Sequence, residues 1–163
     1  MAFACYLTIE GAQQGTFHGE QSFSKFGTGK ITAVRFSSGV VSPHDVATGQ
    51  PSGKRQHQTI KFTKEWGAAT PQLFTALVTN EKLTSVVFNF TRTSADGKEQ
   101  VTLVVTLTNA SVVSIASALN LVDRHQSAFD GHELEDIELT FEKIQIEEKA
   151  SNQTASDDWE AAS

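Results

Sequence analysis

The amino-acid sequence predicts a mainly β domain, a barrel or a sandwich, with one helix on its flank. Segments in which apolar and polar residues alternate recur along the chain between Gly, Pro, Asn and Asp, as is typical of short strands. One segment, residues 70–80, instead places apolar residues at helical spacing. Phenylalanine is frequent, with 11 residues against one tyrosine, which favours a compact β core. A chain of 163 residues can bury such a core without disulfides or metal.

The predicted helix begins at Thr70. A threonine hydroxyl can cap the first turn, and the proline that follows is tolerated at the first helical position. Leu73 and Leu77 lie four residues apart. Phe74 and Val78 have the same spacing, and together the four residues form one apolar stripe. We therefore expect this face of the helix to be buried.

A β-hairpin is predicted directly after the helix. Val86, Phe88 and Phe90 alternate with polar residues, so they point to one side of a strand. Asp96-Gly97 supplies a turn, and residues 101–108 alternate again. The two segments are therefore expected to pair.

Further strands are predicted on both sides of this hairpin. The last of them changes phase after Phe141, which indicates a bulge or a strand buried on both faces. The expected strands are residues 3–10, 31–41, 57–66, 109–121 and 134–146.

Two segments carry almost no apolar residues. Residues 42–56 contain two prolines and two glycines, which predicts a long exposed loop, and loops of this length are usually functional or disordered. From residue 147 the composition turns to Glu, Lys, Ser, Asn, Gln and Ala, with Trp159 as its one large apolar residue. We therefore predict one β domain over residues 1–147 and an acidic, flexible tail over residues 148–163.

Charge and hydropathy exclude several classes of protein. The net charge of −6 argues against nucleic acid as a partner. No apolar run approaches the roughly 20 residues that span a bilayer, so membrane insertion is not expected. The N-terminus lacks the basic segment of a signal peptide, which predicts synthesis in the cytoplasm and, for any export, another route. The single cysteine, Cys5, is expected to be a small buried side chain.

The motifs of common catalytic and metal sites are missing from the sequence. The run Gly27-Thr28-Gly29-Lys30 lacks the first glycine and the final hydroxyl residue of a phosphate-binding loop. No nucleophile elbow is present. The histidines do not have the spacings of a metal site. They are His18, His44, His57, His125 and His132. We therefore expect no catalytic residue, no metal and no cofactor, and a protein that is not an enzyme.

Four segments in the same order carry a resemblance to a known family. They are residues 1–11, Phe36-Ser37-Ser38-Gly39, residues 60–74 and residues 134–144. The chain resembles the haemolysin-coregulated proteins (Hcp), the tube subunits of bacterial type VI secretion systems, over most of residues 1–147. Its most specific part is the passage from Ile60 through Thr-Lys and Thr-Pro into the helix.

The resemblance implies a closed β-barrel of two sheets with one flanking helix. Six copies would form a ring with a wide channel, and the rings would stack into a tube that a contracting sheath propels into a target cell. The implied partners are further copies of the chain, the spike, sheath and baseplate proteins of the machine, and effector proteins in the lumen. Secretion would proceed without a signal peptide.

The resemblance also assigns candidate site residues. It puts Ser37 in the lumen and residues 42–55 at the contact between stacked rings. The stacking candidates are Ser42, Pro43, His44, Asp45, Lys54 and Arg55. We expect Lys54 and Arg55 to meet acidic groups of the opposed ring, because acids are concentrated after residue 130. The polar positions Thr102, Thr106 and Thr108 suit a sheet that faces a water-filled channel.

Three alternatives remain open at this point. A phage tail-tube subunit shares the implied architecture, and neighbouring genes for a sheath, spike or capsid would separate the two. A ligand-binding barrel would need small or polar inward positions, whereas Phe88, Phe90 and Leu107 would fill the interior. An enzyme would need a clustered set of acids and bases, which the spacing does not show.

Overall fold

Antiparallel strands dominate the computed structural model, which describes residues 3–19, 26–119 and 133–159. One helix, α1 (Ala69–Val78), lies between the sixth and seventh strands. The strands are β1 (Phe3–Gly11), β2 (Gly15–Thr16), β3 (Ile31–Ser37), β4 (Val40–Val41), β5 (Gln56–His57), β6 (Ile60–Glu65), β7 (Leu83–Thr93), β8 (Glu99–Leu119), β9 (Glu133–Thr140), β10 (Lys143–Glu148) and β11 (Gln153–Asp158).

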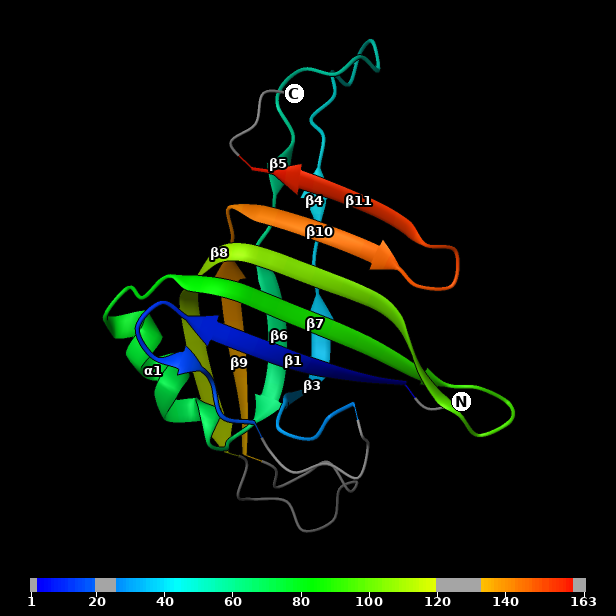
Figure 1. Ribbon diagram of the computed structural model, residues 1–163. Coiled ribbons are helices and arrows are strands. Elements are labelled where there is room, and N and C mark those ends of the chain that lie inside the picture. The colour runs from blue at the N-terminus through cyan, green and yellow to red at the C-terminus, as the bar shows by residue number, and fades with distance from the viewer. Residues whose placement is uncertain (1–2, 20–25, 120–132, 160–163) are drawn as a thin grey trace.

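Six of these strands close into a barrel. β7 pairs with β1, β1 with β3, β3 with β6, β6 with β9, and β9 with β8, which returns to β7. In Figure 1, β11, β10, the first part of β8, β7 and β1 run side by side as a front layer, and β3, β6 and β9 cross behind them. The predicted closed barrel with one flanking helix is confirmed.

Strand β8 joins the two layers because it changes partner along its 21 residues. Residues 103–108 pair with β10, whereas residues 111–119 pair with β9. Between these parts, Asn109 has a φ of 53°, a left-handed conformation that asparagine tolerates. In the adjacent strands of the same chain, residues 141–142 separate β9 from β10 at the same level.

The alternation of apolar and polar residues predicts a different division of this region, with separate strands over residues 101–108 and 109–121 and a single strand over residues 134–146. In the structure β8 is continuous through residue 109, while β9 and β10 are separate strands. The change of phase after Phe141 therefore marks a break at the corner between the layers, and the predicted bulge is wrong.

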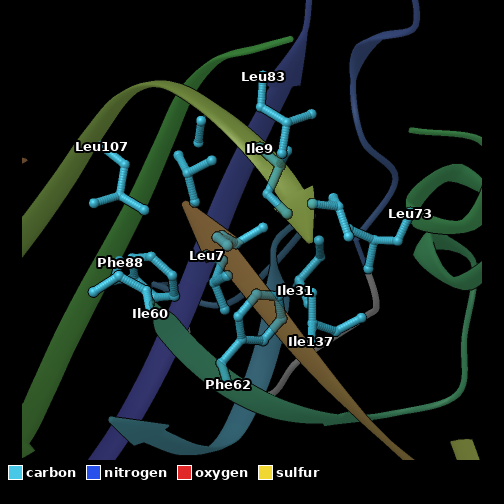
Figure 2. Packing of buried hydrophobic residues seen from close by; sticks show 14 of the residues in the cluster. Leu7, Ile9, Ile31, Ile60, Phe62, Leu73, Leu83, Phe88, Leu107 and Ile137 are labelled. Carbon is cyan, nitrogen blue, oxygen red and sulfur yellow. The ribbon is translucent and has the colours of Figure 1, made fainter. Parts of the chain in front are cut away.

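The alternating positions of the predicted strands do face one core (Figure 2). Phe36 lies edge-on to Phe88 and to Phe90, with ring centroids 4.9 Å apart in both pairs. Phe62 contacts Phe88 in the same way at 5.7 Å. Cys5 is buried against this core, and burial raises the pKa of its thiol to about 12, which keeps it neutral. Large apolar side chains thus fill the barrel interior.

Helix α1 packs on the barrel through fewer residues than predicted. Leu73 and Ala76 are buried, whereas Phe74 and Val78 are 59% and 58% exposed, so the expected burial of the whole stripe is wrong. Small alanines bring one edge of the helix onto the barrel, which turns the neighbouring stripe towards solvent. The helix also begins at Ala69 without a side-chain cap, so the predicted cap by Thr70 is wrong as well.

A buried ion pair occupies the place where the helix meets the barrel. Lys64 Nζ lies 2.6 Å from Glu135 Oε1, and both side chains are 1% exposed. The two residues face each other across β6 and β9. The Thr70 hydroxyl donates to Glu135 at 2.9 Å and accepts from Lys64 at 3.2 Å. The pair therefore joins two strands and the first turn of α1.

Breaking this pair should be far more costly than breaking an exposed one. Lys64→Met leaves the Glu135 carboxylate buried without its cation, which we expect to lower the free energy of unfolding by about 3–5 kcal/mol. The matched control Lys61→Met removes the exposed partner of Glu138 and should cost less than about 1 kcal/mol. Urea unfolding of both variants measures the difference, and equal losses would contradict the account of Lys64.

Candidate functional site

Residues 40–57 form a β-ribbon, and the exposed loop predicted over residues 42–56 makes up its outer part. At its base β4 pairs with β5, and further out His44 and Pro51 form a bridge. Near the tip, the Asp45 carboxylate accepts the N–H of Ala47 at 2.7 Å, and Gly49 turns the chain with a φ of 73°. Figure 1 shows this β-ribbon projecting well beyond the barrel.

The tip of the β-ribbon exposes an apolar side chain. Val46 is 103% exposed, so its own chain buries none of it. The turn around it is nevertheless held, because the Asp45 N–H donates to the Gln50 carbonyl at 2.8 Å and the Gly49 N–H donates to the Asp45 carbonyl at 2.8 Å. The structure thus holds an ordered apolar tip away from the domain.

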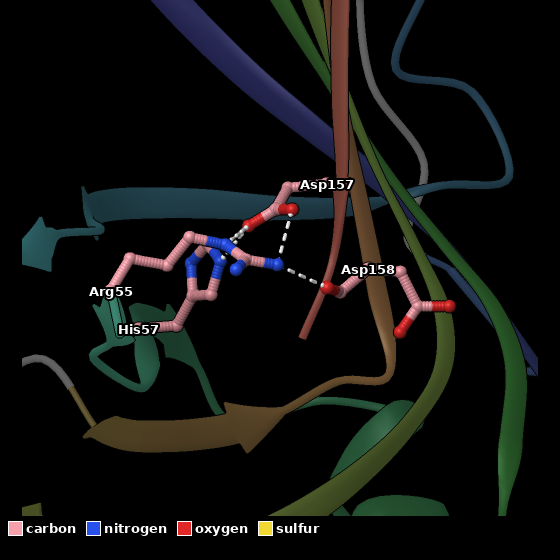
Figure 3. Close-up of polar contacts among 4 residues, drawn as sticks. All are labelled: Arg55, His57, Asp157 and Asp158. Carbon is pink, nitrogen blue, oxygen red and sulfur yellow. Dashed lines mark hydrogen bonds and ion pairs between the residues drawn. The ribbon is translucent and has the colours of Figure 1, made fainter. Parts of the chain in front are cut away.

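A cluster of charged groups fixes the base of the β-ribbon to the C-terminal strand (Figure 3). Arg55 donates to both carboxylate oxygens of Asp157, at 2.5 and 2.7 Å, and to the main-chain carbonyl of Asp158 at 2.7 Å. His57 Nε2 lies 2.7 Å from the same Asp157 carboxylate. We call these residues, Arg55, His57, Asp157 and Asp158, the Asp157 cluster.

Strand β11 brings Asp157 to this position. It pairs with β10 along its whole length, from Gln153 opposite Glu148 to Asp158 opposite Lys143. Beyond it, the Trp159 N–H donates to the Glu142 carbonyl at 2.8 Å.

Trp159 adds an aromatic contact to the same place. Its ring lies 5.3 Å from the ring of His57 and 5.2 Å from that of Phe141, and the His57 side chain is only 7% exposed. The expectation of a flexible tail over residues 148–163 therefore differs from the structure for residues 148–159. Residues 160–163 lie outside the described residues.

An apolar hollow of about 320 Å³ adjoins the Asp157 cluster. Residues of the β-ribbon base, of β10 and of β11 line it, among them Arg55, His57 and Asp157 of the cluster. Its apolar lining consists of Val40, Ile60, Phe141, Ile144, Ile146 and Ala155.

The electrostatics of the cluster favour an ionised Asp157. The hydrogen bonds from Arg55, and secondarily the contact with His57, lower the pKa of its carboxyl group to about 2. The same contact raises the pKa of Arg55, so both groups stay charged at neutral pH. A bidentate contact between arginine and carboxylate also fixes the relative orientation of the two side chains.

Ser37, the predicted lumen residue, lies on another surface. It is exposed at the end of β3, opposite Lys61, which pairs across the strands with Glu138. Arg35 and Asp136 lie beside these residues on the same strands. Together with Ser37, Lys61 and Glu138 they line a hollow of about 420 Å³. We call this surface of β3, β6, β9 and the second part of β8 the Ser37 face.

The predicted channel-lining threonines do not belong to the Ser37 face. Thr106 and Thr108 pair with Gln145 and Lys143 of β10 in the front layer. Thr102 is in the same strand and layer. Ser37 and these threonines, all expected at one channel, therefore lie on two different layers of the structure.

The stacking candidates fall into two groups. Ser42, Pro43, His44 and Asp45 lie in the outer part of the β-ribbon, where the Ser42 carbonyl contacts His44 Nδ1 at 2.7 Å. Arg55 lies at the base and binds Asp157 of its own chain, so its expected contact with acids of another ring differs from the structure. Lys54 is exposed beside it.

Sequence reasoning missed the remaining members of this site. Nothing in the local pattern marked His57 or Asp157 as partners of Arg55, because about one hundred residues separate the two aspartates from the β-ribbon. The one available signal was Trp159, a large apolar residue within a polar segment.

Comparison with known proteins identifies the family. A family model described as "Type VI secretion system effector, Hcp" matches residues 6–147. This chain belongs to the Hcp family. The "Major exported protein" of Pseudomonas aeruginosa is 31% identical over an alignment of 167 positions. The alignment covers 98% of this chain and 96% of that protein. The predicted family is therefore confirmed.

Solved Hcp structures share the fold over nearly the whole chain. One Hcp crystal structure superposes with a TM-score of 0.90 at 27% identity, covering 99% of this chain and 100% of that one. Hcp1 of Escherichia coli superposes with a TM-score of 0.83 at 28% identity, with 97% and 99% covered. Hcp3 of Pseudomonas aeruginosa, a secreted protein, gives 0.77 at 27%, with 98% and 100% covered. The chain is accordingly a tube subunit of a type VI secretion system.

Within the described residues, no group of three or more His, Cys, Asp and Glu side chains could hold a metal ion. The helix α1 in the described part of the chain does not have the length and hydropathy needed to cross a membrane.

The lowered pKa of Asp157 makes a prediction for stability against pH. The carboxyl titrates near 3.9 in an unfolded chain and near 2 in the folded one, so between these values the unfolded state binds more protons and stability rises with pH. The contribution of Asp157 should be complete above about pH 5 and lost as the pH falls through about 2.

The measurement compares urea midpoints of the wild type and Asp157→Asn at several pH values. The gap between them should stay constant from pH 7 to about 5 and close towards pH 2. A gap that is unchanged at pH 2, or already absent at pH 5, would contradict the role of the ionised carboxylate.

Proposed function

We propose that six copies of this chain form a ring with a central channel, and that the rings stack through the outer part of the β-ribbon. The β-ribbon projects beyond the barrel and ends in the exposed Val46, and this observation carries the proposal. An ordered projection with an apolar tip gains little from its own domain, so a neighbouring molecule is the natural source of stabilisation.

The free energies of the two kinds of contact favour the tip of the β-ribbon as the stacking contact over the positively charged residues at its base. Burying a valine side chain is worth about 1.5–3 kcal/mol, whereas an exposed ion pair contributes about 0–1 kcal/mol. A sixfold ring repeats each contact, so modest terms add up across one interface between rings. Arg55 is already bound to Asp157, which leaves residues 42–54 as the proposed stacking contact.

The Ser37 face suits the wall of a channel. It is a polar sheet surface whose charges are balanced, with Arg35 and Lys61 against Asp136 and Glu138. Lys61 Nζ lies 3.3 Å from Glu138 Oε1, so part of this charge is neutralised within the wall. A wall without a strong field of one sign admits effector proteins of either charge.

The remaining partners follow from the role of a tube subunit. The sheath would surround the stacked rings, the spike would sit at their end on the baseplate, and effectors would travel in the lumen. The name of the Pseudomonas relative, a major exported protein, supports export of this chain as well. The role is structural, with no nucleic acid, membrane insertion or cofactor required.

A charge at the tip should separate stacking from ring formation. Light scattering should give about six times the 17.7 kDa chain mass for the wild type. Val46→Asp should keep this mass and the urea midpoint, because the side chain has no contact in its own chain, and should abolish the sedimentation of stacked rings.

Ala95→Asp is the matched control, since it adds the same charge to the exposed turn between β7 and β8 and should stack normally. Val46→Thr, which keeps the shape but adds a hydroxyl, should have an intermediate effect. A monomeric wild type would refute the ring, and normal stacking of Val46→Asp would refute the assignment of the tip.

A further inference from the structure

We propose that the C-terminal strand β11 positions the β-ribbon for stacking, with Asp157 and Trp159 as the positioning residues. This inference rests on the stacking function proposed above and assigns a role in ring-on-ring association to Asp157 and Trp159.

The β-ribbon is connected to the barrel by little main-chain pairing. Within the described residues, β4 and β5 pair only with each other and form a sheet separate from the barrel. Residues 38–39 lead from β3 into β4, and residues 58–59 lead from β5 into β6. These connections are joined to each other by one hydrogen bond, from the Gln58 N–H to the Gly39 carbonyl at 2.9 Å. Two short connections of this kind leave the angle of the β-ribbon to be set by side chains.

The Asp157 cluster supplies those side-chain contacts from one side. Arg55 and His57 belong to the base of the β-ribbon, and both bind the single carboxylate of Asp157. A planar guanidinium with two parallel hydrogen bonds resists rotation about its partner, which a single contact would permit. The additional bond from Arg55 to the Asp158 carbonyl ties the same group to the main chain of β11.

Trp159 packs against His57, the second β-ribbon residue of the Asp157 cluster. Its ring and that of Phe141 lie against the His57 ring at 5.3 Å in both cases. His57 is thus fixed by a polar contact at Nε2 and by aromatic contacts with its ring. Since Trp159 follows β11 directly, one short segment provides both the carboxylate and the aromatic contact.

Geometry makes the base of the β-ribbon a sensitive place. Because Val41 pairs with Gln56, Val46 lies about four residues beyond the level of Arg55, which corresponds to roughly 13 Å of extended strand. A rotation of about 10° at the base would therefore move Val46 by roughly 2 Å, which follows from that strand length. Such a shift is about half of the distance between two carbon atoms in contact and is sufficient to weaken a contact with a neighbouring ring.

The composition of β11 agrees with this role. Residues 153–156 are exposed, so the strand buries little apolar surface of its own. It lies at the edge of the sheet, outside the six strands that close the barrel. Its contribution to the domain is concentrated in residues 157–159, the ones that contact the β-ribbon.

The test uses the full-length chain with Asp157→Asn and Trp159→Ala. Both variants should keep the ring mass in light scattering. Hydrogen exchange of residues 42–53 should become about tenfold faster, because the base of the β-ribbon opens more often. Sedimentation of stacked rings should fall by a similar factor.

Glu147→Gln is the matched control, since it removes a carboxylate of the neighbouring strand β10 that contacts Lys149 and not the β-ribbon. Its exchange rates and stacking should equal those of the wild type. Arg55→Met should reproduce Asp157→Asn, and the double variant should be no worse than either one, because both act through one contact.

The outcomes separate this inference from the stacking function. Unchanged exchange in Asp157→Asn, or faster exchange with normal stacking, would overturn the positioning role. Loss of the ring in that variant would also overturn it, since β11 would then be needed for ring closure. If Val46→Asp stacks normally, the assignment of the tip fails, whatever Asp157→Asn does to exchange.

Discussion

The architecture depends on strand β8, whose pairing changes along its length. Its first part carries β7 on one side and β10 on the other, and its second part pairs with β9 and thereby closes the barrel. This arrangement leaves β10 and β11 as an extension of the front layer beyond the closed barrel. Because the extension reaches the base of the β-ribbon, the last strand of the chain can contact residues from its first half. Both the barrel and the Asp157 cluster therefore follow from one long strand.

Much of the fold could be predicted because its main cause is local alternation. Phe88, Leu107 and Ile137 occupy the inward positions that the pattern assigned to them. The errors arose where a second constraint acts. Periodicity shows that a helix is apolar, but not which of two adjacent stripes meets the barrel, and so Phe74 was misplaced. Likewise the strand β11 is held mainly by main-chain pairing, which leaves no apolar pattern in the sequence.

The candidate site was harder to predict, since its contacts join distant parts of the chain. Arg55 was expected to reach another ring because a basic pair in a polar loop suggests an external partner. Its actual partner, Asp157, is 102 residues away and lies in a segment that looked like a solvated tail. The correction changes the physical picture of stacking from ion pairs at the base to an apolar contact at the tip. It also gives the acidic C-terminal segment a specific structural partner.

The central claim is that the β-ribbon is the contact between stacked rings while the Ser37 face lines the channel. Electron cryomicroscopy of tubes assembled from the full-length chain tests it most directly, because one map shows both surfaces. The account predicts that Val46 is buried against the adjacent ring and that Ser37 and Lys61 face the central channel. A map in which the β-ribbon points into solvent, or in which the Ser37 face is covered by a neighbouring subunit, would contradict it.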